Sequence, residues 1–149
     1  MITIINYGLG NLGSVLNMLN KLQVPVQVTN DIGVIQSAEK ILLPGVGAFD
    51  AAMEKLTNTK LREVLDHKVL VEKKPLLGIC LGMQLLTKGS EEGVLPGLGY
   101  VSAYTYKFQR QDKIKVPHMG WNYVQNVQDS PLTLNLNSKS RFYFVHSYY

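Results

Sequence analysis

Pro75-Leu76-Leu77-Gly78-Ile79-Cys80-Leu81-Gly82-Met83-Gln84-Leu85-Leu86 is the stretch that decides the fold of this chain. Its first five residues form a short, wholly apolar run that predicts a buried β-strand, and residues 81–87 predict a helix directly after it. A strand that passes through a tight, glycine-flanked turn into a helix is typical of a nucleophile elbow. We therefore expect an α/β fold with Cys80 at the turn.

The surroundings of Cys80 favour a reactive thiolate. Gly78 and Gly82 suit a crowded, strained backbone, and the helix that follows directs its free N–H groups and partial positive charge toward the sulfur. The N–H of Leu81 can also face a developing oxyanion. A buried structural cysteine in a glycine-rich turn is the alternative interpretation. The strand–turn–helix context favours the nucleophile.

The same alternation of strand and helix patterns extends over the first 90 residues. Because the strands are continuous apolar runs, we expect a mostly parallel central sheet, buried on both faces and flanked by helices. After residue 98 the chain changes character, and Tyr100–Tyr106 and Arg141–Val145 predict an added antiparallel β portion. The other predicted strands are residues 2–5, 24–28 and 40–43, and the other predicted helices are residues 12–22, 49–56 and 60–71.

Composition excludes several classes of protein. The chain has 149 residues, a length that suits one domain with a real core, and a net charge of +4 from scattered Lys and Arg, so we expect no nucleic-acid partner. A single cysteine rules out an internal disulfide and favours a reducing, cytoplasmic location. There is no signal-peptide pattern and no apolar stretch of about 18 residues, so we expect no membrane span. No residue cluster has metal-ligand spacing, and we expect neither a metal nor another cofactor.

Two further glycine-rich turns follow predicted strands, at the sheet edge where function collects in parallel α/β folds. In Pro44-Gly45-Val46-Gly47 the glycines would let a peptide N–H turn toward a substrate oxygen, although an ordinary turn fits the residues as well. Gly8-Leu9-Gly10 and Gly13 have the spacing of a dinucleotide-binding fingerprint, with Asp31 near the place of its ribose-binding acid. From the residues alone, this is a fair rival to the nucleophile interpretation.

Taken together, five motifs carry a resemblance to a known family. The Gly78–Leu86 segment resembles the elbow of triad-type (class I) glutamine amidotransferases, whose fold is flavodoxin-like. The other four narrow the resemblance to the glutaminase subunits of imidazole glycerol phosphate synthases, and together the set covers the whole chain in order. Because that family uses the first loop for partner contact, the resemblance disfavours dinucleotide binding. These four motifs are Tyr7–Asn11, Pro44–Phe49, Pro117–Asn122 and Tyr143–Tyr148.

The resemblance implies a role for each matching residue. Cys80 would be the nucleophile, and the N–H groups of Gly47 and Leu81 would hold the oxyanion. The residues implied to hold glutamine are Gln84, Glu92, Ser147 and Tyr148. The residues implied to face the partner are Asn11, His118, Met119, Trp121 and Asn122.

The implied activity is that of a hydrolase within a lyase complex of histidine biosynthesis. Glutamine would be hydrolysed to glutamate and ammonia through a cysteine thioester. The ammonia would pass, within a heterodimer, to a (β/α)-barrel cyclase/synthase subunit that makes imidazole glycerol phosphate. No cofactor is implied.

One departure from the family pattern leaves alternatives open. The family's catalytic His and Glu lie in a Phe-His-Pro-Glu-like motif that does not occur in these 149 residues, and His118 and His146 do not match it. We therefore expect residues 1–149 to be a single amidotransferase domain that lacks its C-terminal part and is inactive alone. The alternatives are a class I amidotransferase for another acceptor, such as a surface-polysaccharide sugar, and a non-catalytic binding module if 149 residues is the natural length.

Overall fold

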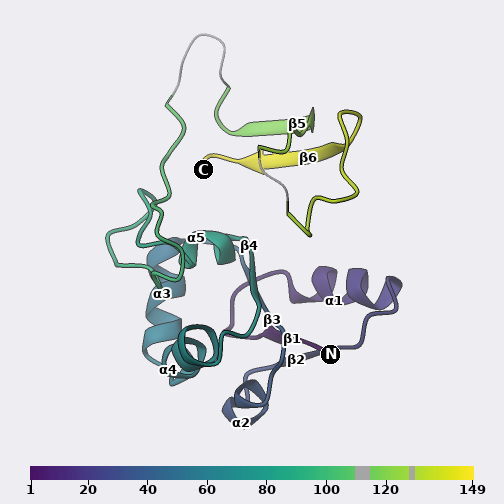
Figure 1. Cartoon of the computed structure of the whole chain (residues 1–149). Coiled ribbons are helices and arrows are strands. Elements are labelled where there is room, and N and C mark those ends of the chain that lie inside the picture. The colour runs from purple at the N-terminus through teal and green to yellow at the C-terminus, as the bar shows by residue number, and fades with distance from the viewer. Residues whose placement is uncertain (110–114, 128–129) are drawn as a thin grey trace. The chain divides into compact units, whose positions relative to one another are not determined.

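The computed structural model of this protein describes residues 1–109, 115–127 and 130–149 (Figure 1). The chain forms two compact units, Met1–Tyr106 and Lys107–Tyr149. Whether residues 1–149 act as one amidotransferase domain stays a prediction.

A four-stranded parallel sheet is the centre of the first unit. Its strand order is β2-β1-β3-β4, and every neighbouring pair is parallel, which confirms the predicted sheet. This is the flavodoxin-like order, in which the direction of strand addition reverses between β1 and β3 and ligands bind beyond the carboxyl ends of the strands. The strands are β1 (Ile2–Ile5), β2 (Val26–Thr29), β3 (Ile41–Gly45) and β4 (Leu76–Cys80).

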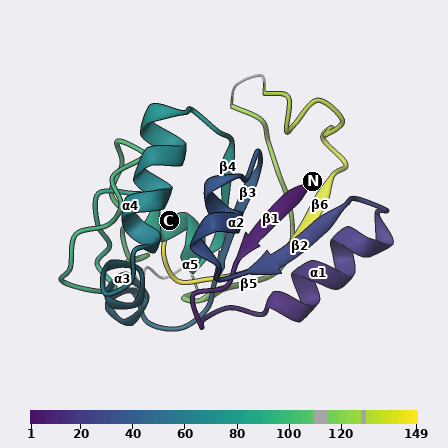
Figure 2. The same cartoon turned by 90° about the horizontal axis from the view of Figure 1, so that it is seen from below.

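Helices flank this sheet, and Figure 1 shows α1 on the opposite side of it from α3 and α4. In Figure 2, seen from below, α1 again lies beside β2 and away from α3 and α4. The short α2 was not predicted as a helix, and Asp31 caps it by accepting the Val34 N–H at 3.0 Å. The helices are α1 (Leu12–Lys21), α2 (Ile32–Gln36), α3 (Phe49–Thr57), α4 (Leu61–Asp66), its π-helical continuation η1 (His67–Val71) and α5 (Leu81–Leu85).

Burial differs between the strands that lead to the site. Every residue of β3 is buried, as expected for a strand covered on both faces. In β4, however, Leu77 is 48% and Ile79 is 39% exposed, so the expectation of burial on both faces is wrong for this strand. Successive side chains of a strand point to opposite faces. One face of β4, at the edge of the four-stranded sheet, is therefore open in the first unit.

The second unit contains the predicted antiparallel portion. Strands β5 (His118–Tyr123) and β6 (Arg141–His146) pair antiparallel, with His118 opposite His146. The predicted β structure at Tyr100–Tyr106 is limited to an isolated bridge between Thr105 and Ser90, and the segment forms no strand. Its backbone bonds instead to the loop after α5, where Lys88 and Glu91 donate to the carbonyls of Ala103 and Thr105. In the described part of the chain, no helix is long and apolar enough to cross a membrane.

Candidate functional site

Cys80 lies at the turn where β4 passes into α5. It is the last residue of the strand and the N-cap residue of the helix, with φ 57° and ψ −118°, and it is exposed. A positive φ is unfavourable for a residue with a side chain and persists only where surrounding structure enforces it. Such strain collects at functional sites, and here it holds an exposed thiol at the carboxyl edge of the sheet.

The glycines on either side of Cys80 are required by the close approach of neighbouring backbone. A Cβ atom at Gly78 would lie 2.5 Å from the Gly82 carbonyl oxygen and 2.7 Å from Met83 Cα. A Cβ atom at Gly82 would collide with the carbonyl oxygen of Leu43 in the neighbouring strand. The prediction that only small residues can flank the elbow is therefore confirmed, because a side chain at either glycine would collide with neighbouring backbone.

The turn after β3 lies beside this elbow. Gly45, the last residue of β3, is the register partner of Cys80, so the residues that follow each of them leave the sheet at the same edge. Gly47 has φ 104° and is exposed, while Leu81 opens α5 and is buried. The N–H groups of a first helical turn have no acceptor within the helix. Gly47 and Leu81 thus belong to the two turns at this edge, and their oxyanion role stays a prediction.

Gln84 and Glu92 belong to one hydrogen-bonded group. Ser90, which is fully buried, donates from Oγ to Gln84 Oε1 at 2.8 Å and accepts the Glu92 N–H at 3.1 Å. Burial raises the pKa of the Glu92 carboxyl, and a hydrogen bond from Gln84 partly opposes this shift. Within the described residues, Glu92 Oε2 is buried without a hydrogen-bond partner. Sequence reasoning missed Ser90, because a lone serine in a loop leaves no periodic signal.

Hydrogen bonds from a side chain of α3 and from a side chain just after α5 hold the loop that carries Glu92. Asp50 of α3 accepts the backbone N–H groups of Val94 and Leu95, each at 3.0 Å. Thr87, which follows α5 and is buried, donates to the carbonyl of Gln84 at 2.7 Å or that of Gly89 at 2.9 Å. The buried carboxylate oxygen of Glu92 is therefore held in place by the fold.

Tyr7 is a second residue that sequence reasoning did not single out. Its hydroxyl donates to the Pro44 carbonyl at 2.9 Å, and the side chain is only 6% exposed. Burial, and secondarily the charge of Cys80, raises the pKa of Tyr7 to about 12. The hydroxyl is therefore protonated at neutral pH and close enough to Cys80 to sense its charge.

Ser147, Tyr148 and both candidate histidines belong to the second unit. His146 Nδ1 donates to the Tyr148 carbonyl at 2.8 Å, and His146 Nε2 lies 2.9 Å from His118 Nδ1. His118 Nε2 faces Asn122 Nδ2 at 3.4 Å. Each ring therefore has hydrogen-bond partners for both nitrogens.

The predicted partner-facing residues are mostly accessible. Met119 and Trp121 are 59% and 63% exposed, and the Arg141 guanidinium lies 5.6 Å from the centre of the Trp121 ring. Asn11, in the first unit, is the N-cap of α1, where its side chain accepts the Ser14 N–H at 3.2 Å. The role of these residues in partner contact stays a prediction.

The structure does not support the dinucleotide fingerprint. In that motif the third glycine permits close packing of helix on strand, but in the described part of the chain a Cβ atom at Gly13 would have no neighbour within 4 Å. The carboxylate of Asp31, the candidate ribose-binding acid, is occupied in capping α2. Nor do the described residues contain a group of three or more His, Cys, Asp or Glu side chains that could hold a metal ion.

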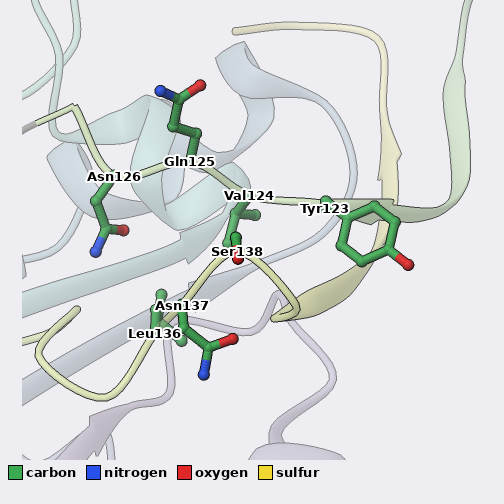
Figure 3. A pocket seen from close by; sticks show the side chains of 7 residues that line it. All are labelled: Tyr123, Val124, Gln125, Asn126, Leu136, Asn137 and Ser138. Carbon is green, nitrogen blue, oxygen red and sulfur yellow. The ribbon is translucent and has the colours of Figure 1, made fainter.

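A cavity of about 570 Å³ in the second unit is lined by seven residues, with several amide side chains among them (Figure 3). None of its residues is a predicted site residue. We assign it no function. The lining residues are Tyr123, Val124, Gln125, Asn126, Leu136, Asn137 and Ser138.

Comparison with known proteins agrees with this geometry. Residues 3–149 match the family model "Glutamine amidotransferase class-I". The chain is 54% identical over 149 residues to imidazole glycerol phosphate synthase subunit HisH 2 of Methanococcus maripaludis, and 48% identical over 149 residues to the subunit of the same name in Pseudomonas aeruginosa. Each match covers 100% of this chain and 74% of the relative.

Among solved structures, a crystal structure of a glutamine amidotransferase is similar with a TM-score of 0.60 at 19% identity. The match covers 74% of this chain and 59% of that chain, and at this identity it supports the fold alone. The match to the family model and the identity to the two HisH subunits extend over essentially the whole chain, and they agree with the strained cysteine elbow on a flavodoxin-like sheet. The chain therefore belongs to the class I glutamine amidotransferases, among the HisH subunits of imidazole glycerol phosphate synthase.

Proposed function

We propose that this chain carries out the glutaminase reaction of imidazole glycerol phosphate synthase, with Cys80 as the nucleophile. The observation that carries the proposal is the strained, exposed Cys80, held between two glycines and paired in register with Gly45. This arrangement presents a thiol and two sets of backbone N–H groups at one edge of a parallel sheet. Acyl transfer to sulfur needs these groups at one place.

In the proposed reaction, the Cys80 sulfur attacks the side-chain amide carbon of glutamine. The amide oxygen becomes an oxyanion, which the N–H groups of Leu81 and Gly47 stabilise. The C–N bond then breaks, and the nitrogen takes up a proton and leaves as ammonia. Water cleaves the resulting γ-glutamyl thioester to give glutamate and the free thiol. His118 and His146 do not match the family's catalytic histidine, and we assign the proton transfer to neither.

Glu92 and Gln84 provide recognition of the amino-acid end of glutamine. The buried Glu92 Oε2, which has no partner within the described residues, suits the substrate's ammonium group. A bound cation would also compensate the burial that raises the pKa of this carboxyl. Ser90 donates to Gln84 Oε1, so the amide nitrogen of Gln84 is the group that donates to Glu92. Ser147 and Tyr148 complete the glutamine-binding set by resemblance.

A second subunit consumes the ammonia in this proposal. The names of the relatives describe a subunit of a synthase, which implies a partner subunit. We propose that the partner is a (β/α)-barrel cyclase that forms a heterodimer with this protein in the cytoplasm. The proposed contact residues are Asn11, His118, Met119, Trp121 and Asn122.

The test uses the natural full-length protein in complex with its partner subunit. Wild-type complex should release glutamate from glutamine and form a γ-glutamyl thioester that mass spectrometry detects on the peptide containing Cys80. The Cys80→Ala complex should bind glutamine and release no glutamate above background. Glutamate release by the Cys80→Ala complex at the wild-type rate would refute the proposal.

A different acceptor for the ammonia is the second candidate function. The family model that residues 3–149 match names a class I glutamine amidotransferase and no acceptor, so an amidotransferase for another acceptor, such as a surface-polysaccharide sugar, is the alternative. Rescue of a histidine auxotroph that lacks its glutaminase subunit assigns this protein to the histidine pathway. Failure of rescue by a protein that is active as a glutaminase assigns it to another acceptor.

A further inference from the structure

Tyr7 connects the carboxyl ends of β1 and β3, the two strands between which the direction of strand addition reverses. It is the second residue after β1, and its buried hydroxyl donates to the carbonyl of Pro44, the second-to-last residue of β3, at 2.9 Å. Pro44 and Gly45 are the register partners of Ile79 and Cys80 in β4. The Tyr7 hydroxyl therefore acts on the peptide that lies directly beside the elbow.

The loop around Tyr7 is fixed by its own backbone hydrogen bonds. The Asn6 side chain accepts the Gly8 N–H at 3.1 Å, and the Asn6 N–H donates to the Thr29 carbonyl at 2.8 Å. Farther along the loop, a Cβ atom at Gly10 would lie 3.5 Å from both the carbonyl carbon and the oxygen of Pro44. The loop thus packs against the Pro44 carbonyl at two points, which gives the Gly8-Leu9-Gly10 motif a use other than phosphate binding.

Gly45 is enclosed between Tyr7 and the elbow. A Cβ atom at Gly45 would lie 2.6 Å from the Tyr7 hydroxyl oxygen and 2.8 Å from the backbone nitrogen of Gly82. The Tyr7 hydroxyl and the first turn of α5 therefore both lie against Gly45.

The turn beyond Gly45 is much less constrained. Val46 and Gly47 are exposed, and no atom of the described residues would lie within 4 Å of a Cβ atom at Gly47. Because none of these residues packs on that side of Gly47, the direction of its N–H depends on how the chain leaves β3. The orientation of the Pro44–Gly45 peptide sets that departure.

We propose that Tyr7 is a positioning residue for the reaction of Cys80, whose hydroxyl fixes the Pro44–Gly45 peptide and thereby aims the Gly47 N–H at the oxyanion. This inference rests on the proposed glutaminase function. A donor that is displaced by a fraction of an ångström loses much of its effect on a transition state, while substrate binding is little changed. The loss should therefore fall on kcat.

The experiment compares Tyr7→Phe with wild type in the full-length complex and uses Tyr100→Phe as the matched control. Tyr100 is also a partly buried tyrosine whose hydroxyl donates a hydrogen bond, at 2.7 Å to Asp66, but its partner is in α4 and not at the elbow. Two rates are measured: glutamine hydrolysis, which passes through an oxyanion, and alkylation of Cys80 by iodoacetamide, which does not. For Tyr7→Phe we expect kcat to fall about 10-fold with KM within about twofold of wild type. The alkylation rate should be unchanged, and Tyr100→Phe should match wild type in both assays.

Each other outcome has a definite meaning. A wild-type kcat in Tyr7→Phe overturns the inference. A parallel fall in hydrolysis and alkylation also overturns it, because the hydroxyl would then support the elbow as a whole. The Cys80→Ala complex separates this failure from failure of the proposed function. If Cys80→Ala is inactive while Tyr7→Phe is fully active, only the positioning role is lost, whereas an active Cys80→Ala complex refutes the glutaminase proposal itself.

Discussion

Gly45 and Cys80 are direct register partners at the ends of the parallel strands β3 and β4. The pairing means that two turns, each rich in glycine, leave the sheet side by side. It also explains why residue 45 must be glycine, because a Cβ atom at Gly45 would lie 2.8 Å from the backbone nitrogen of Gly82, in the first turn after the elbow.

The elbow should not tolerate a methyl group at Gly82. In Gly82→Ala the new Cβ would collide with the Leu43 carbonyl oxygen, a backbone atom that cannot move without disturbing β3. We expect a loss of at least about 2 kcal/mol in the free energy of unfolding, measured by urea denaturation of the full-length protein, and loss of glutaminase activity.

Gly13→Ala is the matched control for this substitution. Gly13 lies in α1, and a Cβ atom there would lie more than 4 Å from every other residue that the structure describes. Alanine in a helix is favoured over glycine by about 0.5–1 kcal/mol, so we expect Gly13→Ala to be neutral or stabilising. Equal stability of the Gly82→Ala and Gly13→Ala variants would contradict the close packing described for the elbow.

Glu92 should make stability depend on pH in the absence of substrate. Burial raises the pKa of this carboxyl above its ordinary value of 4.5, so the folded protein holds the proton more tightly than the unfolded chain does. The stabilisation is fully present below pH 4.5 and is lost as the pH rises through the raised pKa. Glu92→Gln removes the charge, and we expect this variant to unfold at a higher temperature than wild type at pH 7.

The pH profile and substrate binding provide the checks on this prediction. The difference in unfolding temperature should disappear at pH values below 4.5, where Glu92 is neutral in both states. Glutamine should bind the Glu92→Gln variant more weakly, because the ammonium group of the substrate loses its counter-charge. A Glu92→Gln variant that is less stable than wild type at pH 7 would refute the assignment of Glu92 as a destabilised, substrate-binding carboxylate.

The parallel sheet and the elbow could be predicted from the sequence because both depend on patterns of adjacent residues. Residues 2–5, 40–43 and 75–79 are short, mostly apolar runs that end in glycine-rich turns, and their short length and flanking glycines favour strands over helices. Tyr100–Tyr106 is rich in aromatic and β-branched residues but forms no strand, and its backbone bonds to the loop at residues 88–91. Composition alone does not reveal which partner will satisfy a backbone segment.

Within the site, the sequence indicated residues whose motif is contiguous and missed those whose role depends on distant partners. Cys80 and its glycines are read from five adjacent positions. Tyr7 acts on Pro44, 37 residues away, and Asp50 holds the N–H groups of Val94 and Leu95, which are 44 and 45 residues away. Only the folded chain brings such pairs together, so no spacing rule could have named them.

Ser90 should affect substrate binding more than turnover. Its hydroxyl orients the Gln84 amide and accepts the Glu92 N–H, so Ser90→Ala removes both bonds without touching the elbow. A lost buried hydrogen bond costs about 1.4 kcal/mol. We therefore expect the KM for glutamine to rise about 10-fold with kcat within about twofold.

Ser37→Ala is the control for loss of a serine hydroxyl. Ser37 donates to the Val34 carbonyl at the exposed end of α2, and its removal should leave both kinetic constants unchanged. The prediction for Ser90 fails if Ser90→Ala lowers kcat by the same factor as it raises KM, because that pattern would place the hydroxyl in the transition state.

Trp121 should contribute to partner binding. Its side chain is 63% exposed on β5, the strand that also carries the exposed Met119, and the Arg141 guanidinium lies 5.6 Å from the centre of its ring. Exposed tryptophans with a fixed orientation are frequent hot spots of protein interfaces, where truncation to alanine costs about 2 kcal/mol or more. We expect Trp121→Ala to raise the Kd for the partner subunit at least about 30-fold, measured by isothermal titration calorimetry, with the thermal unfolding of the isolated protein almost unchanged.

Val127→Ala is the control for this substitution. It removes a side chain of the same unit that is 96% exposed and outside the predicted contact set, and its Kd should equal that of wild type. Equal affinities for Trp121→Ala and Val127→Ala would remove β5 from the proposed partner surface.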